Sequence, residues 1–385
     1  MQPAIIIPAY NRPQALLRLL RSLAQADYPS GESVPLVFSI DRGPGGTHPE
    51  VRAMAEAFAW PHGPKQVIAH TTHLGLLQNF FFCGDLTARY GSAILLEDDL
   101  LVSPAFYLYA QQGLKFYAGH PRIAGLSLFR YPRNGYTHQP FEPLPDAGDV
   151  FFMQLPSIQG QVWSEAGWEA FAHWYRNSSR VGGEALHEVW STFDAEEYFP
   201  VLVRYLAAND QVVVFPRTSL TTGFGDMGTH FARRVDYFQV PLQHRQTDFR
   251  FLPLEEALAI YDSFMELIPA SFKRLVPGLR AYDFDVDLNA SKQPELLQAS
   301  HVLTTRTVRS AVQTFALAMR PMEANVLHEM EGDGIALARR ADLRWDRRAT
   351  WKTQLRLRAY AHTEPRPGLR QLLANLLLDL LRWRA

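Results

Sequence analysis

The chain is short of cysteine, of net charge and of long apolar runs, and each shortage excludes a class of protein. Its 385 residues contain a single cysteine, Cys83, which excludes an intrachain disulfide framework and favours a reducing compartment. Three phenylalanines precede this cysteine, so we interpret it as a small core residue. The formal net charge of −1 argues against a general nucleic-acid-binding protein, and we expect no nucleic-acid partner.

No stretch of the sequence is apolar over the length that a membrane-spanning helix requires. The N-terminal run of three isoleucines ends at Pro8, which is too short for a spanning helix or for the core of a secretion signal. We therefore expect a cytoplasmic protein, either soluble or peripheral at the inner face of the plasma membrane. A luminal enzyme released from its anchor is the alternative.

Short apolar runs alternate with helical patterns over the first half of the chain. This order predicts an α/β fold with a mainly parallel, doubly wound sheet. Because the chain exceeds the usual size of one compact domain, we expect a first domain at 1–240 and a C-terminal extension, mixed or mostly helical, at 241–385. The expected strands are 4–7, 35–40, 66–69, 93–96, 123–128 and 211–215, and the expected helices are 14–24, 51–59, 76–89, 103–117, 163–175 and 195–208.

The C-terminal extension has a different sequence pattern. Helical patterns cover 254–268 and 305–319, and alternating acidic residues at 282–289 predict a strand with an acidic face. That segment superficially resembles a calcium-binding loop, but Leu288 stands where such a loop requires glycine. Metal binding there is therefore disfavoured.

The tail at 339–385 is basic, with twelve Arg and Lys residues and four acidic residues. Its last helix, expected within 369–385, interleaves leucines with arginines. This pattern is typical of a helix that lies on an anionic membrane surface. Packing against the protein body or against the second copy of a homodimer is an equal alternative.

Three consecutive carboxylates, Glu97, Asp98 and Asp99, follow the strand expected at 93–96. Adjacent carboxylates raise one another's pKa unless a cation or hydrogen-bond donors neutralise them. Mg²⁺ and Mn²⁺ prefer such oxygen ligands and keep other coordination positions for phosphate. Since open α/β sheets bind ligands at the carboxyl ends of their strands, we predict a metal–diphosphate site here. An acidic turn that caps the next helix is the alternative.

Six sequence features occur in the order found in GT-A fold glycosyltransferases, and about the first 235 residues resemble these enzymes. The resemblance is closer to bacterial family 2-like members related to the Golgi N-acetylglucosaminyltransferase I group. The features are an opening at 5–13 with 38–43, a Leu-Gly step at 73–75, Leu-Glu-Asp-Asp-Leu and Ser-Pro-x-Phe at 96–106, a Trp-rich segment at 160–168, Phe-Asp at 193–194, and Gly-Phe-Gly with a later His at 223–230. Two positions depart from the family pattern: His73 stands where Asn is frequent, and Phe193 where Trp is frequent.

The resemblance implies a role for each candidate residue. The donor, a UDP-sugar with N-acetylglucosamine as the first choice, would be bound around Pro8, Tyr10, Arg12, Asp41, Gly75, Glu97 and Asp98. Asp99 would ligate Mn²⁺ or Mg²⁺ at the diphosphate, with His230 near the metal. Asp194 would be the general base, with Glu197 as a neighbouring alternative, and Trp163 and Trp168 would stack on the acceptor.

Several of these residues have an ordinary structural alternative. The tryptophans could pack in the core, and Arg12 could be a solvated residue at a helix start. Asp41 could serve the turn before Gly43. His230 could be a hydrogen-bonded loop residue, although the preceding glycines would let backbone approach a phosphate.

The resemblance implies an inverting, metal-dependent transfer of a sugar to a glycan or lipid-linked acceptor. Such a reaction needs charge stabilisation at the leaving diphosphate and a base for the acceptor hydroxyl, and its transition state is oxocarbenium-like. One alternative is a non-catalytic glycan-binding or scaffold protein on the same fold. A sugar-nucleotide pyrophosphorylase is disfavoured, because the loop at 8–12 contains no glycine.

Overall fold

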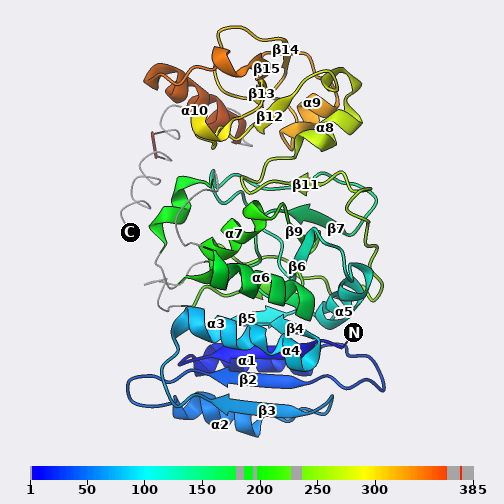
Figure 1. Ribbon diagram of the computed structural model, residues 1–385, viewed down its shortest axis with the longest axis vertical. Coiled ribbons are helices and arrows are strands. Elements are labelled where there is room, and N and C mark those ends of the chain that lie inside the picture. Colours follow the sequence, from blue (N-terminus) through cyan, green and yellow to red (C-terminus); the bar gives the residue numbers. More distant parts are fainter. Residues whose placement is uncertain (1, 179–185, 194–196, 227–235, 362–372, 375–385) are drawn as a thin grey trace. The chain divides into compact units, whose positions relative to one another are not determined.

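The computed structural model describes residues 2–178, 186–193, 197–226, 236–361 and 373–374 (Figure 1). The chain divides into two compact units. Unit 1 comprises 1–274 with 291–296, and unit 2 comprises 275–290 with 297–385. Residues 241–274, which the sequence assigned to the extension, therefore belong to the first unit.

A nine-stranded sheet forms the centre of the described part of unit 1. Five of its eight strand pairings are parallel, which confirms the predicted α/β class with a mainly parallel sheet. The antiparallel strand β8, inserted between β4 and β6, was not predicted as a strand. In sheet order the strands are β11 (Ile260–Tyr261), β7 (Val150–Met153), β9 (Val212–Pro216), β6 (Ile123–Ser127), β8 (Gln161–Ser164), β4 (Ser92–Leu95), β1 (Ala4–Ala9), β2 (Leu36–Ile40) and β3 (Lys65–Ala69).

Helices pack against this sheet through apolar stripes. Four of the five leucines of α1 lie with Ile5, Ile7 and Phe38 in a single buried cluster, namely Leu16, Leu19, Leu20 and Leu23. Successive side chains of a strand point to opposite faces of the sheet, so the side chain of Ile6 points to the face opposite that of Ile5 and Ile7. The helices of unit 1 are α1 (Pro13–Ala24), α2 (Pro49–Ala57), α3 (Gly75–Asp85), α4 (Thr87–Tyr90), α5 (Phe106–Phe116), α6 (Glu165–Asn177), α7 (Tyr198–Ala208), the 3₁₀ turns η1 (Glu188–Thr192) and η3 (Pro294–Leu296), and α8 (Pro269–Leu275), whose last residue reaches unit 2.

A small second sheet lies next to the acidic segment. Strand β5 (Leu100–Val102) pairs in the antiparallel sense with β10 (Thr221–Gly223). The pairing places Gly223 opposite Leu100, the residue that follows Asp99. The Gly-rich segment, separated from the acids by more than 120 positions in sequence, is thereby fixed beside them.

Unit 2 combines helices with a small sheet. Its described residues include a four-stranded sheet in the order β12 (Phe284–Asp287), β13 (His301–Thr304), β15 (Ile335–Arg339), β14 (Gln313–Phe315). The helical elements are η2 (Pro277–Leu279), α9 (Glu323–Leu327), η4 (Arg340–Asp342) and α10 (Arg347–Ala361). The strand predicted within 282–289 is confirmed as β12.

The acidic face of β12 has structural partners. Asp287 is fully buried and accepts from the guanidinium Nε of Arg306 at 2.6 Å. Arg306 in turn lies 4.3 Å from the ring centre of Trp345. Asp285 accepts from two backbone N–H groups at 298 and 299. The two carboxylates are thus used in holding unit 2 together.

Two predicted helices are wrong. Residues 254–268 contain turns and the short strand β11, and 305–319 contain β14 and irregular backbone. In the first segment Leu254, Ala257 and Ile260 are buried at a helix-like spacing, but β11 pairs with β7 at the sheet edge. Tertiary pairing thus overrides local periodicity. No described helix combines the length and apolar character that crossing a bilayer requires.

Candidate functional site

The three carboxylates occupy the loop between β4 and β5. Strand β4 runs parallel to β1, and β1 runs parallel to β2, so the carboxyl ends of all three strands meet at one edge of the sheet. Pro8 and Tyr10 lie at the end of β1, and Asp41 follows β2. This is the edge at which open α/β sheets hold ligands.

Arg12 bridges two of the carboxylates and offsets one of their two negative charges. Its guanidinium forms ion pairs with Asp98 and with Oδ2 of Asp99, the latter at 2.7 Å. Burial would lower the pKa of Arg12, but Asp98 and Asp99 outweigh it, so the pKa is raised and the cation is firmly held. Burial raises the pKa of Asp98 to about 6, although Arg12 and a backbone hydrogen bond from Tyr10 oppose the rise. The predicted approach of Arg12 to a nucleotide stays a prediction.

Glu97 is hydrogen-bonded to the start of helix α7. Its Oε1 accepts a 2.7 Å hydrogen bond from the hydroxyl of Tyr198, the first residue of α7. Tyr198 is itself buried and stacks on Phe80 of α3, with ring centres 4.2 Å apart. Burial and the neighbouring Asp99 together raise the pKa of Glu97 to about 7. Glu197, one residue before Tyr198, is thereby anchored to the acidic segment through its neighbour.

Asp99 retains a free acceptor. Its Oδ2 is bound by Arg12, whereas its Oδ1 is buried and has no hydrogen-bond partner among the described residues. Across the part of the chain that the structure describes, no three His, Cys, Asp or Glu side chains converge to hold a metal ion by themselves. One open carboxylate oxygen nevertheless fits a hard cation that takes its remaining ligands from phosphate and water.

The carboxylate of Asp41 accepts hydrogen bonds from the backbone. Its Oδ1 accepts from the N–H groups of Arg42 and Leu74, at 2.7 and 2.8 Å, and its Oδ2 accepts from Gly75 at 3.0 Å. The Nδ1 atom of His73 lies 3.0 Å from the same Oδ2. A carboxylate accepts about four hydrogen bonds, so little capacity remains. These contacts give Asp41 a positioning role at the N-terminus of α3, and the expected hydrogen bond to a uracil or ribose stays a prediction.

The two tryptophans expected at the acceptor are core residues. Trp163 and Trp168 are 4% and 2% exposed. Both rings pack on Phe171, and the Nε1 atom of Trp168 donates to Asp85 at 2.8 Å. A ring with no exposed face cannot stack on a sugar, so the acceptor prediction for this pair is wrong.

A second aromatic cluster does reach the surface. Trp190 of η1 lies 5.6 Å from Phe193 and 5.1 Å from Phe199 between ring centres, and Phe193 is 42% exposed. Tyr136, from the long loop after β6, adds its ring at 5.9 Å from Trp190. Sequence reasoning missed this cluster, although the aromatic density at 190–199 was a visible signal. Asp194 and His230 lie outside the described residues.

The Gly-rich segment is anchored on α1. Arg18 pairs with Asp226, and its guanidinium carbon lies 4.2 Å from the ring centre of Phe224. Together with the β5–β10 pairing, this contact holds the segment before His230 next to the acids. The sequence order alone did not show this adjacency.

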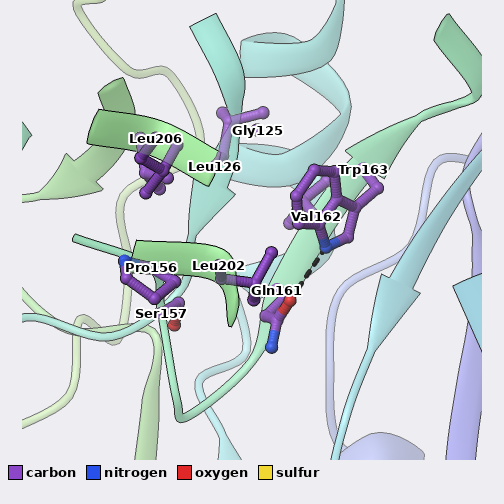
Figure 2. Close-up of a pocket in the computed structure, with 10 residues that line it drawn as sticks. Gly125, Leu126, Pro156, Ser157, Gln161, Val162, Trp163, Leu202 and Leu206 are labelled. Carbon is purple, nitrogen blue, oxygen red and sulfur yellow. Dashed lines mark hydrogen bonds between the residues drawn. The ribbon is translucent and has the colours of Figure 1, made fainter. Parts of the chain in front are cut away.

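A small pocket elsewhere in the sheet does not coincide with these residues. Figure 2 shows it between Leu126 of β6, Gln161 and Trp163 of β8, and Leu202 and Leu206 of α7. The dashed line is the 2.9 Å hydrogen bond from Trp163 Nε1 to Gln161. The lining is largely apolar and contains no carboxylate, so we assign it to packing imperfection beneath α7.

No protein family model matches this chain, and no curated protein matches it. Among solved structures it resembles glycosyltransferases. Residues 1–349 of S. aureus TarS in complex with UDP-GlcNAc match at 14% identity and a TM-score of 0.37, over 60% of each chain. The mannosyltransferase PcManGT from Pyrobaculum calidifontis, in complex with GDP-Man and Mn²⁺, matches at 16% identity and a TM-score of 0.30, over 45% of this chain and 47% of its own. The chain thus spans less than two thirds of the structures it matches.

Proposed function

We propose that this protein is a nucleotide-sugar-dependent glycosyltransferase whose donor site is the acidic loop between β4 and β5. The observation that carries the proposal is the buried, unpartnered Oδ1 of Asp99 at the carboxyl end of a parallel sheet. A buried acceptor without a donor is costly unless a ligand satisfies it. A divalent cation with phosphate oxygens is the ligand that best suits a single hard oxygen at such an edge.

Each carboxylate would then have a different task. Asp99 would hold Mg²⁺ or Mn²⁺, and a bound ion of this kind supplies positive charge at the leaving diphosphate. Asp98 holds the guanidinium of Arg12 beside the acidic loop. Glu97 fixes the start of α7 through Tyr198. His230 as a further metal-side residue remains part of the proposal.

The acceptor side is proposed to lie at η1 and α7. An inverting transfer needs a carboxylate that takes the proton of the acceptor hydroxyl, for which Asp194 is the first choice and Glu197 the second. The exposed ring of Phe193 and the adjoining Trp190 replace Trp163 and Trp168 as the surface that would stack on an acceptor sugar. Aromatic faces are suited to that contact because they combine an apolar surface with a rigid shape.

A non-catalytic glycan-binding protein is the second candidate. The Arg12 bridge favours it, because a guanidinium already occupies oxygens of both Asp98 and Asp99. In that case Arg12 would take the place of a metal beside Asp98 and Asp99, and the aromatic cluster would be the glycan-binding surface. Contact with a membrane and formation of a homodimer stay predictions under either candidate.

The experiment is a thermal-shift screen of the full chain. The probes are UDP-N-acetylglucosamine, which we expect to be the donor, and GDP-mannose, each with Mn²⁺ and with a chelator. A ligand at 100 times its Kd stabilises the folded state by about 2.7 kcal/mol, which raises the melting temperature by several degrees. We expect a shift that requires both a nucleotide-sugar and Mn²⁺. A shift that the chelator leaves unchanged would refute metal dependence, and binding of glycans without any nucleotide-sugar would favour the second candidate.

A further inference from the structure

Helix α10 is anchored in unit 2 through one face. Ala349, Thr353 and Leu357, four residues apart, are buried. The hydroxyl of Thr353 accepts from the backbone N–H of Thr307 at 3.3 Å, and Arg356 donates to the Thr305 carbonyl at 2.7 Å. These contacts fix which side of the helix faces outward.

The outward side carries two large apolar residues. Trp351 is 63% exposed and Leu355 is 43% exposed. Each is two residues from Thr353, which is about 200° around a helix that turns roughly 100° per residue. Trp351 and Leu355 are also four residues apart, so they are neighbours on the same face. The helix therefore presents an apolar pair directly opposite its buried row.

Positive charge surrounds this pair. The 15 residues of α10 contain five basic side chains and no acidic one. Arg356 points inward to the Thr305 carbonyl, whereas Arg347 and Arg358 are exposed and lie four residues before and seven residues after Trp351. The remaining exposed cations are Arg348 and Lys352. We call Trp351, Leu355 and these four cations the α10 face.

We propose that the α10 face binds the surface of an anionic lipid bilayer. Tryptophan prefers the boundary between headgroups and hydrocarbon, and a helix that lies in this boundary combines apolar residues with Lys and Arg. Each Lys or Arg near an anionic surface strengthens binding by about fivefold. Because α10 carries several cations and no carboxylate, its charge is complementary to a continuous negative surface.

A protein partner fits the α10 face less well. A stable protein–protein interface buries about 800 Å² on each side around an apolar centre. Two apolar side chains within a ring of cations are too few for such a centre. The proposal concerns α10, which lies within the basic tail at 339–385 but is separate from the last helix expected within 369–385. It does not depend on the glycosyltransferase assignment.

The test is sedimentation of the full chain with phosphatidylcholine vesicles, with and without phosphatidylglycerol. Trp351→Ser/Leu355→Ser is compared with Val312→Ser, a change at another apolar residue of unit 2 that is 46% exposed. Arg347→Gln/Arg358→Gln is compared with Arg309→Gln/Arg339→Gln, two exposed arginines of unit 2 outside α10. We expect the wild type to sediment only with the anionic vesicles, and more weakly as salt rises.

The apolar double variant should bind at least about tenfold more weakly, and the charge double variant about 25-fold more weakly, while both controls bind like the wild type. Unchanged melting temperatures would show that the exposed changes leave unit 2 folded. Wild-type affinity in both α10 variants would overturn the proposal in favour of the last helix expected within 369–385. Sedimentation with neither vesicle, or equally with both, would also overturn it.

Discussion

Two acidic positions at one edge of the sheet have opposite surroundings. Asp41, after β2, accepts from three backbone N–H groups and lies beside His73. The segment 97–99, after β4, is bound mainly by the side chains of Arg12 and Tyr198, with one backbone hydrogen bond from Tyr10 to Asp98, and Oδ1 of Asp99 has no partner among the described residues. A carboxylate at a strand end is therefore a candidate ligand only if acceptor capacity remains after the local backbone is satisfied.

The cause of the difference is the local chain geometry. The segment that leads into α3 passes close to the end of β2, so the free N–H groups of the first helical turn reach Asp41. Residues 97–99 are followed by β5 instead of a helix, and β5 uses its backbone groups in pairing with β10. No helix start is available there, so apart from the Tyr10 backbone group the acids depend on side chains or a ligand.

The largest effect should come from Asp99→Asn. The amide oxygen is a much weaker ligand for a hard cation than a carboxylate, and a bound metal contributes several kcal/mol to charge stabilisation. We expect Mn²⁺-dependent binding of the nucleotide-sugar to disappear in calorimetry and any transfer rate to fall by about 10³-fold. The amide oxygen can still accept from Arg12, so stability without metal should fall by no more than about 1–2 kcal/mol.

Asp248→Asn, at an exposed position, is the matched control for Asp99→Asn. It should leave both metal-dependent binding and stability unchanged. Normal Mn²⁺-dependent affinity in the Asp99 variant would remove Asp99 as the metal ligand.

The next effect should come from Asp41→Asn, and it should be on stability. The amide presents an NH₂ group to backbone N–H donors, so at least one of them loses its acceptor. A buried donor left without a partner costs about 1–3 kcal/mol. Chemical unfolding should show this loss, while Mn²⁺ dependence of donor binding is kept. If Asp41→Asn is as stable as the wild type and abolishes donor binding, the contrast drawn between the two acids is wrong.

The smallest effect concerns pH. The pKa of Glu97 is raised to about 7, so the folded protein holds this proton more tightly than the unfolded chain does. Its contribution to stability is therefore present at low pH and is lost as pH rises from about 4.5 to about 7. The pKa of Asp98 is raised to about 6, so its contribution to stability is likewise lost as the pH rises to about 6.

Glu97→Gln should flatten this part of the pH profile, with a difference on the order of 1–2 kcal/mol between pH 5 and pH 8. Urea unfolding in the presence of a chelator measures it without metal binding. Glu56→Gln, at an exposed residue of α2, should retain the wild-type slope. Parallel profiles for wild type and Glu97→Gln would show that Glu97 titrates normally.

Prediction from sequence worked where one local pattern decides the outcome. The leucine spacing of α1, the apolar run of β1 and the acids after β4 all lie where the pattern placed them. It failed at 254–268, where buried residues have a helical spacing but the segment lines the sheet edge through β11. It also failed for Trp163 and Trp168, because only the packed aromatic cluster shows that their rings have no open face.

The sequence by itself determined the alternation of strands and helices and the position of three carboxylates at a strand end, because both depend on neighbours within a few residues. Only the tertiary structure decided which acids keep free oxygens. That outcome depends on contacts between residues far apart in the chain, such as Asp41 with Gly75, Asp99 with Arg12, and Glu97 with Tyr198. Hydrogen-bond capacity is a local property of each side chain, but its use is decided by whatever the fold brings beside it.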